Sequence, residues 1–272
     1  MIRLGHIVYS NCFPVHARLL EGRELENIDI VRGTPAELNH LLASGAIDVA
    51  PCSSIEFARH SADYRILEGL AIASRGPVQS ILLETEKPLE RLGGQDIAVA
   101  SASATSAVLL RTLLEKRYDV RARFRWFDQE SDTDPFASGA SAALRIGDVA
   151  LLGTAGTGRY LIDLGEAWTD WTGLPFVYAV WQTRLPPARD DELLRLRDLL
   201  LESLAWFEAN APDLAERRGR EYGVPSERLL AYWRALCYRL DAPAISGLMR
   251  FYELAAELGE APPVRSLSLL PA

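Results

Sequence analysis

The sequence predicts an α/β protein with two lobes and a helical C-terminal part. Strand-like and helix-like segments alternate through the first half of the chain, which is typical of right-handed βαβ units with a mostly parallel sheet. Two strand-like segments, residues 66–73 and 78–83, follow each other directly and interrupt this alternation. From residue 190 to residue 258 the pattern is helical, with Pro212, Pro225 and Pro243 as breaks.

Two helices of the first lobe carry start signals. Thr34-Pro35-Ala36-Glu37 and Ser53-Ser54-Ile55-Glu56 both match a capping box, so we interpret Glu37 and Glu56 as structural. In chain order, the elements expected here are a strand at 2–9, a helix at 14–20, a strand at 28–32, a helix at 35–42, a strand at 47–50 and a helix from 53.

The alternation resumes in the second lobe and ends in a Trp-rich stretch, residues 163–181. Pro175 interrupts that stretch, and residues 176–181 have the aromatic and β-branched composition of a buried strand. The earlier elements expected in this lobe are a strand at 96–100, a helix at 105–116, a strand at 122–127 and a strand at 148–152.

This order divides the chain into a first lobe of residues 1–85 plus 182–272 and a second lobe of residues 86–181. The chain then crosses between the lobes twice, near residues 83–88 and near residues 177–184. Two crossings form a hinge, and a cleft between two lobes is the usual place for a ligand.

Composition and charge exclude several classes of function. The 272 residues are 49% hydrophobic and 24% charged, as in ordinary globular domains. A net charge of −8 without a basic block argues against nucleic-acid binding. No apolar run approaches the roughly 20 residues of a membrane span, and the first residues lack secretory-signal features. We therefore expect a cytoplasmic protein that acts on a small molecule, and the sequence predicts no particular oligomeric state.

The cysteines and histidines predict no metal site. Cys12, Cys52 and Cys237 are too few and too scattered for a disulfide framework or a zinc site, and we expect Cys12 to be a buried apolar residue. The four histidines, at positions 6, 16, 40 and 60, lie apart and lack the HExxH type of spacing.

The corners where strands lead into helices hold the candidate site residues. Asn11 follows the first strand; it either orients a substrate or caps the next helix. Ser103 opens a helix with Ser106 three residues later instead of glutamate; this corner either binds an anion, which we favour, or holds an ordinary serine cap. Gly153-Thr154 is a similar but weaker corner, and Ser80 lies in the strand before the first crossing. The residues expected to bind substrate are Ser54, Ser103, Thr105, Ser106, Gly153 and Thr154.

Several motifs resemble chorismate dehydratase of the futalosine route to menaquinone, from residue 1 to about residue 185. They are Tyr9-Ser-Asn11-x-x-Pro14, Gly33-Thr-Pro-Ala-Glu-Leu-Asn39, Gly45-Ala-Ile-Asp-Val-Ala50, Ile146-Gly-Asp148-Val-Ala150-Leu151, Asp163-Leu-Gly-Glu-Ala-Trp168 and Thr172-Gly-Leu-Pro-Phe-Val-Tyr-Ala-Val-Trp181.

The resemblance implies the two-lobed fold of type II periplasmic binding proteins, used as a cytoplasmic enzyme. It also implies conversion of chorismate, a dicarboxylate, to 3-[(1-carboxyvinyl)oxy]benzoate with loss of water and without a cofactor. Asn11 and Ser80 match the catalytic Asn and Ser of the family. Glu84 departs from the family pattern, which has a small polar residue there, and this puts the polarity near the hinge in question.

Two other functions remain open at this point. One is the sister enzyme that makes 1,4-dihydroxy-6-naphthoate on a similar fold, and the other is non-catalytic carboxylate binding. The Thr-Gly-Leu-Pro-Phe block favours the dehydratase over its sister. Because no His, Asp or Glu is an evident base, our hypothesis is that the enolpyruvyl carboxylate of the substrate takes the proton.

Overall fold

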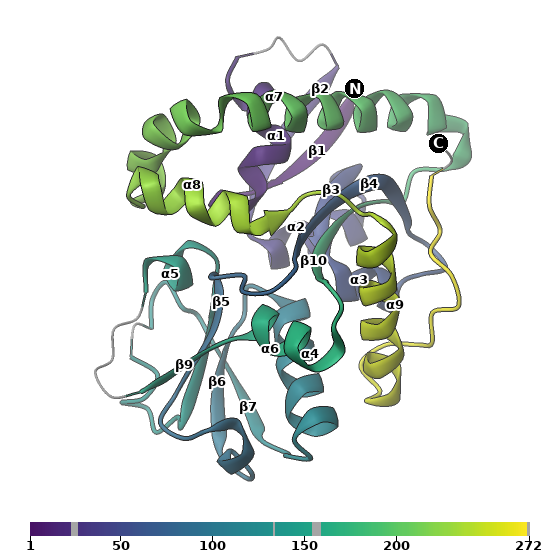
Figure 1. The fold of residues 1–272 in the computed structure, drawn as a ribbon. Coiled ribbons are helices and arrows are strands. Elements are labelled where there is room, and N and C mark those ends of the chain that lie inside the picture. The colour runs from purple at the N-terminus through teal and green to yellow at the C-terminus, as the bar shows by residue number, and fades with distance from the viewer. Residues whose placement is uncertain (23–26, 133, 154–158, 271–272) are drawn as a thin grey trace.

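Two mixed sheets organise the chain in the computed structural model, which describes residues 1–22, 27–132, 134–153 and 159–270 (Figure 1). Within these residues, the first sheet has the order β11 (Leu236–Cys237), β4 (Arg65–Ser74), β10 (Phe176–Thr183), β3 (Val49–Ser53), β1 (Ile2–Ile7), β2 (Ile28–Gly33). The second has the order β7 (Arg123–Phe127), β6 (Asp96–Ala100), β8 (Ala142–Ile146), β5 (Ile81–Thr85), β9 (Tyr160–Asp163). We call each sheet with its helices a lobe.

Helices pack on both lobes (Figure 1). The first lobe carries α1 (Phe13–Leu20), α2 (Pro35–Ser44), α3 (Ser54–Arg59), α7 (Asp190–Tyr222), α8 (Ser226–Ala235) and α9 (Ala242–Glu257). The second carries α4 (Ala104–Thr112), α5 (Gly147–Leu152) and α6 (Leu164–Thr172), and the π-helical η3 (Leu113–Arg117) continues α4. Single 3₁₀ turns are η1 (Ser10–Cys12), η2 (Leu89–Arg91) and η4 (Pro187–Arg189).

The prediction of mostly parallel sheets is wrong, because the strands next to the crossings run against their neighbours. β1 pairs in parallel with β2 and β3, and β6 with β7 and β8. In contrast, β10 is antiparallel to both β3 and β4, and β5 is antiparallel to both β8 and β9. Each of these two strands follows a crossing, so the chain enters its sheet from the side of the other lobe.

The crossings lie earlier than the sequence suggested. β5 already belongs to the second sheet and β10 to the first, so the crossings fall between Ser74 and Ile81 and between Asp163 and Phe176. The expected boundaries at residues 85 and 181 placed both strands in the opposite lobe. Each crossing contains a proline, which removes a backbone donor and ends regular pairing.

Two further element predictions are wrong. The expected strand at 148–152 is the helix α5, and the strand precedes it as β8. Gly147, with a φ of +64°, turns the chain between them, and a short apolar run alone does not distinguish strand from helix. Pro212 does not end α7, because buried residues such as Leu204 and Leu214 hold the helix on either side of it.

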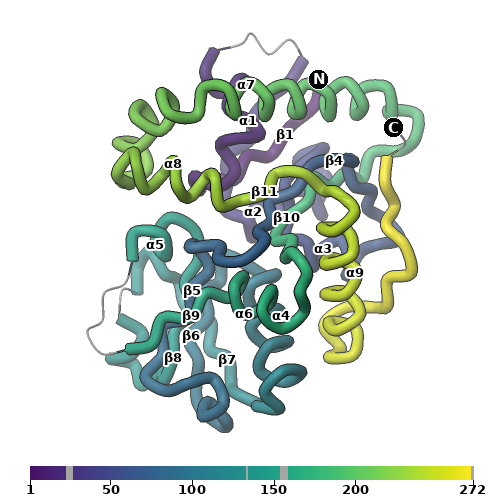
Figure 2. The backbone as a smooth tube through the Cα atoms, in the orientation of Figure 1, coloured from purple at the N-terminus to yellow at the C-terminus, as the bar shows by residue number. Residues whose placement is uncertain are grey.

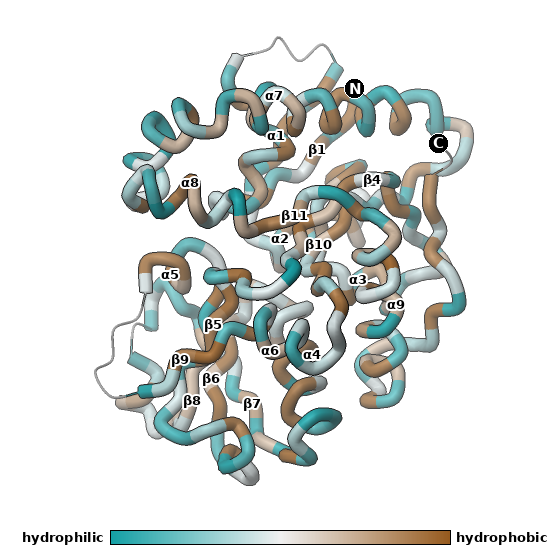
Figure 3. Tube along the Cα trace, in the orientation of Figure 1, coloured by the Kyte–Doolittle hydropathy of each residue, from teal (hydrophilic) through white to brown (hydrophobic). Residues whose placement is uncertain are grey.

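Other predictions are confirmed. Thr34 and Glu37 form the capping box of α2, and all eight residues of β10 are buried. Hydrophobic residues concentrate along the strands, whereas apolar and polar residues alternate along α7 (Figure 3). The N-terminus and the last described residues lie on the first lobe (Figure 2), where Leu269 makes a bridge to Ile66. Among the described helices, none has the long apolar stretch needed to cross a membrane.

The Asp163 carboxylate ties the two crossings together. Its Oδ1 accepts hydrogen bonds from the backbone N–H groups of Val78, Gly165 and Glu166, at 3.0, 2.9 and 3.1 Å. Its Oδ2 accepts one from Gln79 at 2.6 Å. The carboxylate therefore caps α6 and at the same time fixes the turn that precedes β5. Gln79 in this turn has a φ of +62°, a left-handed conformation that costs about 1–2 kcal/mol.

We predict that Asp163→Ala lowers the free energy of unfolding by at least about 3 kcal/mol, since each hydrogen bond to a charged group contributes about 1.5–3 kcal/mol. Urea denaturation followed by circular dichroism measures this change. The control is Thr34→Ala, which removes the N-cap bond accepted from the Glu37 backbone N–H of α2 and should cost about 1 kcal/mol. A loss no larger than that of the control contradicts the proposed tie between the crossings.

Candidate active site between the two sheets

A small uncharged cavity lies between the sheets, and both lobes line it. Its volume is about 40 Å³, far below the roughly 300–1,000 Å³ of ordinary ligand pockets. The lobes must therefore separate before a ligand of that size can enter. None of the described residues in the lining carries a charge, and the polar ones are Tyr9, Asn11, Ser53, Ser80, Ser103, Ser106 and Tyr178.

Asn11 lies in η1, directly after β1, and lines this cavity. Its Oδ1 is buried and has no hydrogen-bond partner among the described residues. The alternative of a helix cap does not apply, because Cys12 is the N-cap of α1 and makes no side-chain bond. A buried amide oxygen without a hydrogen-bond partner is costly, so this atom is well placed to meet a ligand.

Ser80 lines the same cavity, one residue before β5. Its Oγ accepts a hydrogen bond of 2.7 Å from the Tyr232 phenol of α8, and its carbonyl accepts one of 2.9 Å from Gly147 N–H. Burial raises the pKa of Tyr232 well above its ordinary value, and its bond to Ser80 opposes that rise only in part. Tyr232 therefore stays protonated.

Ser103 and Ser106 also line the cavity, at the start of α4. Their hydroxyls are not fully free, as we expected them to be. Ser103 Oγ accepts a bond from the Ser106 backbone N–H at 3.3 Å, and the two hydroxyls share one bond of 2.9 Å. Since two hydroxyls carry two protons and this shared bond uses one, the other proton remains available to the cavity.

Ser54 and Thr105 lie behind the cavity and join the lobes. Ser54 Oγ donates to the carbonyl of Val177 at 2.8 Å, and Thr105 Oγ1 accepts from the backbone N–H of Ile55 at 3.2 Å. Thr105 thus caps α3 from the opposite lobe.

The capping box predicted at Ser53 is wrong, because the side chain of that serine makes no cap bond. Glu56, its expected partner, pairs instead with Arg59 at 2.9 Å. Of the weaker corner, Gly153 ends α5 and lies outside the cavity lining, and Thr154 lies outside the described residues.

Asp148 is a residue of this region that the sequence reasoning missed. Its oxygens accept hydrogen bonds from Ser10 N–H at 3.0 and 3.2 Å and from the Ser10 hydroxyl. This contact joins α5 of the second lobe to the corner that carries Asn11. Burial raises the pKa of Asp148, and the bonds from Ser10 oppose that rise. Its position beside Gly147, at a strand-to-helix corner, could have marked it as a candidate. The wrong assignment of residues 148–152 to a strand hid that corner.

Helix N-termini supply the positive potential that the lining side chains lack. Pro35 at the start of α2 and Ser103 and Ser106 at the start of α4 all line the cavity. The first backbone N–H groups and the dipole of a helix favour a bound anion. The cavity therefore suits a carboxylate even though the chain has a net charge of −8.

Comparison with known proteins identifies the family. A family model described as menaquinone biosynthesis matches residues 2–257. The chain belongs to this family. The chain is also similar to the chorismate dehydratase of Thermus thermophilus, at 30% identity over 92% of this chain and 93% of that protein.

Solved structures confirm the fold. A protein of Archaeoglobus fulgidus superposes with a TM-score of 0.78 at 21% identity, over 95% of this chain and 97% of its own. The periplasmic aliphatic sulphonate binding protein of Escherichia coli superposes with a TM-score of 0.69 at 16% identity, over 100% of this chain and 94% of its own. This family member therefore has the expected periplasmic-binding-protein fold.

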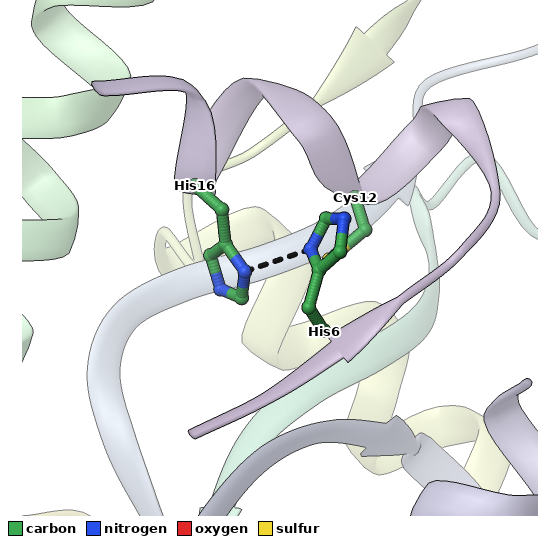
Figure 4. A group of neighbouring side chains, drawn as sticks. All are labelled: His6, Cys12 and His16. Atoms are coloured by element: carbon green, nitrogen blue, oxygen red, sulfur yellow. Dashed lines mark hydrogen bonds between the residues drawn. The ribbon is translucent and has the colours of Figure 1, made fainter. Parts of the chain in front are cut away.

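A second cluster of chemical groups lies inside the first lobe, where His6, Cys12 and His16 are all buried (Figure 4). Their potential ligand atoms lie within 4.8 Å of one another, although the sequence separates them. Trp181 Nε1–H donates to His16 Nε2 at 3.1 Å, so His16 carries its proton on Nδ1 and donates it to His6 Nδ1 at 2.9 Å.

This arrangement favours a hydrogen-bonded chain over a metal site. A metal on His16 Nδ1 would move the ring proton to Nε2, where it would face the N–H of Trp181. Burial also raises the pKa of Cys12 to about 12, which keeps its thiol protonated. As predicted, Cys12 is a buried residue.

The buried histidines predict a pH-dependent stability. Burial lowers the pKa of His6 from 6.5 to about 3 and lowers that of His16 as well. Below pH 6.5 these two histidines bind protons in the unfolded chain but stay neutral in the folded chain. Stability is thus fully present above pH 6.5 and falls toward pH 3, by about 1.4 kcal/mol per pH unit for each histidine.

Urea denaturation at pH 8, 7, 6 and 5 measures this slope. His6→Gln should reduce the slope of stability against pH by the contribution of one histidine, about 1.4 kcal/mol per pH unit. The control His40→Gln, on an exposed part of α2, should leave the slope unchanged. Equal slopes in the wild type and in His6→Gln contradict the prediction.

Asp148→Asn should loosen the closed state of the lobes, because an amide N–H would face the N–H of Ser10. Losing charge-assisted hydrogen bonds of about 1.5–3 kcal/mol each shifts the population toward the open form. Small-angle X-ray scattering should then report a larger radius of gyration. Asp198→Asn, at an exposed side chain of α7, is the control that should scatter like the wild type. An unchanged radius in Asp148→Asn contradicts this role.

Proposed function

We propose that the protein dehydrates chorismate to 3-[(1-carboxyvinyl)oxy]benzoate in the futalosine route to menaquinone. The observation that carries the proposal is the meeting of Asn11 and Ser80 in one uncharged cavity between the lobes. Membership of a menaquinone biosynthesis family and the similarity to a relative named chorismate dehydratase support it.

The reaction is an elimination that produces an aromatic ring. The C–H bond at the ring carbon bearing the enolpyruvyl ether breaks, and its electron pair forms the third ring double bond. The hydroxyl group on the neighbouring carbon leaves and departs as water with a proton. Electrons balance without an oxidant or reductant, so we expect no redox cofactor. Formation of the benzene ring makes the step strongly favourable.

The proton acceptor in this proposal is the enolpyruvyl carboxylate of the substrate. No carboxylate lines the described part of the cavity. Asp148 lies nearby, but both its oxygens accept hydrogen bonds from Ser10. A substrate held in one conformer brings its own carboxylate to the ring proton, and such positioning contributes much of a rate enhancement.

The protein then binds, orients and excludes water. One substrate carboxylate meets the start of α4, where Ser103 and Ser106 retain a free hydroxyl proton. Asn11, whose Oδ1 has no partner among the described residues, orients the reacting ring. Ser80 donates a hydrogen bond to the departing oxygen, which leaves as water with the proton that the enolpyruvyl carboxylate has taken from the ring. Closure of the lobes, held by Asp148 and Ser10, removes competing water.

The rival functions fit less well. The similarity to a chorismate dehydratase and the Thr172–Trp181 block favour the dehydratase over 1,4-dihydroxy-6-naphthoate synthase. The sulphonate binding protein shares the fold alone at 16% identity, so it does not argue for non-catalytic binding. We propose a cytoplasmic enzyme, as fits a biosynthetic step and the buried free thiols of Cys12 and Cys52.

Purified protein incubated with chorismate should produce an aromatic product that is lighter by one water, detected by ultraviolet absorbance and mass spectrometry. Chorismate that binds but stays unchanged would instead indicate a carboxylate-binding protein. Turnover of the sister enzyme's substrate, without turnover of chorismate, would indicate 1,4-dihydroxy-6-naphthoate synthase.

Asn11→Ala should lower kcat about 100-fold and change KM much less, because the lost contacts orient the reacting ring rather than anchor the carboxylates. Steady-state kinetics with chorismate measures both constants. The matched control is Asn210→Ala on α7, whose amide bonds only to the Trp206 carbonyl of its own helix among the described residues. An unchanged kcat in Asn11→Ala removes this residue from the mechanism.

A further inference from the structure

We propose that Tyr232 is a positioning residue that fixes the direction in which Ser80 donates its hydroxyl proton. Through it, α8 sets the geometry of the reaction from outside the cavity. The inference rests on the proposed function and adds a residue from the helical C-terminal part, in which no site residue was expected.

The hydrogen bond between the two side chains carries the argument. Tyr232 Oη donates to Ser80 Oγ at 2.7 Å, and both residues are buried, with exposures of 0% and 1%. A serine hydroxyl has one proton, and its oxygen already accepts from Tyr232. Among the described residues, the Ser80 side chain makes no other hydrogen bond, and it lines the cavity. Its proton is therefore directed toward the substrate.

The phenol keeps the proton that it donates in this bond. Burial holds the pKa of Tyr232 far above neutrality, so the phenol remains a donor at every pH at which the protein would work. The Asn11 side chain also interacts with this phenol. A hydroxyl that accepts a strong bond becomes a better donor, because hydrogen bonds in a buried chain polarise one another.

The next residue of α8 holds the other half of the site. Trp233 Nε1–H donates to the carbonyl of Ser10 at 2.8 Å, one residue before Asn11. Its ring stacks on Phe13 at 5.4 Å and meets Phe207 of α7 edge-on at 5.1 Å. Two consecutive residues of α8 thus contact both parts of the site. Trp233 contacts the corner that bears Asn11, and Tyr232 contacts Ser80, one residue before β5.

The test is a double-mutant cycle of Tyr232→Phe and Ser80→Ala, measured by steady-state kinetics with chorismate. Tyr232→Phe keeps the ring, so the fold should persist, and kcat should fall about 10- to 100-fold with KM within about 3-fold of the wild type. In the Ser80→Ala background, Tyr232→Phe should have no further effect. A merely structural role would instead lower kcat by the same factor in both backgrounds, and that result overturns the proposal.

Tyr238→Phe is the matched control, because the Tyr238 phenol is also buried but has no hydrogen-bond partner among the described residues. Its kcat should equal that of the wild type, and thermal unfolding should show all the variants folded at the assay temperature. If the wild type turns over chorismate but Tyr232→Phe keeps full kcat, only the role of Tyr232 fails. A folded wild type without turnover overturns the proposed function and this inference together.

Discussion

The four backbone hydrogen bonds accepted by the Asp163 carboxylate are the interaction on which the rest of the structure depends. At about 1.5–3 kcal/mol each, they outweigh the cost of about 1–2 kcal/mol for the left-handed Gln79. The turn that contains Gln79 leads directly into Ser80. One carboxylate therefore decides where the chain passes between the sheets and where a cavity residue stands.

Residues outside the cavity determine the geometry inside it. The described lining is uncharged, and Asn11 and Ser80 have short side chains, so neither reaches far without support. That support comes from residues outside the lining: Asp148 accepts hydrogen bonds from Ser10, and Tyr232 donates one to Ser80. The Asp148 carboxylate belongs to this surrounding layer. The described lining of the cavity therefore holds no carboxylate that could act as a base in a competing reaction. Helix starts then provide the attraction for anions.

The sequence allowed the architecture to be predicted better than the site. The elements from β1 to α3 were predicted from their regular alternation. Periodicity and caps such as Thr34 depend only on residues that are close in sequence. The placement of β5 and β10 depends on pairing with distant strands, so the lobe boundaries came out in the wrong places. Asn11 and Ser80 were candidates because of their positions in the predicted strands and corners, and the family resemblance implied their catalytic roles. Tyr232 contacts Ser80 across 152 positions of sequence, and no local pattern reports such a contact.

The central place of β10 has a consequence for how the chain is made. This strand fills the gap between β3 and β4, yet it is synthesised only after the whole second sheet, from Ile81 to Asp163. On the ribosome, the second lobe is therefore complete while β3 still lacks β10 on one side and β4 lacks both of its neighbours, β10 and β11. Unpaired strand edges template association between chains, so we expect the nascent chain to be most prone to aggregation before these two strands emerge. The length of the inserted lobe itself adds little, since the entropy of loop closure grows only logarithmically.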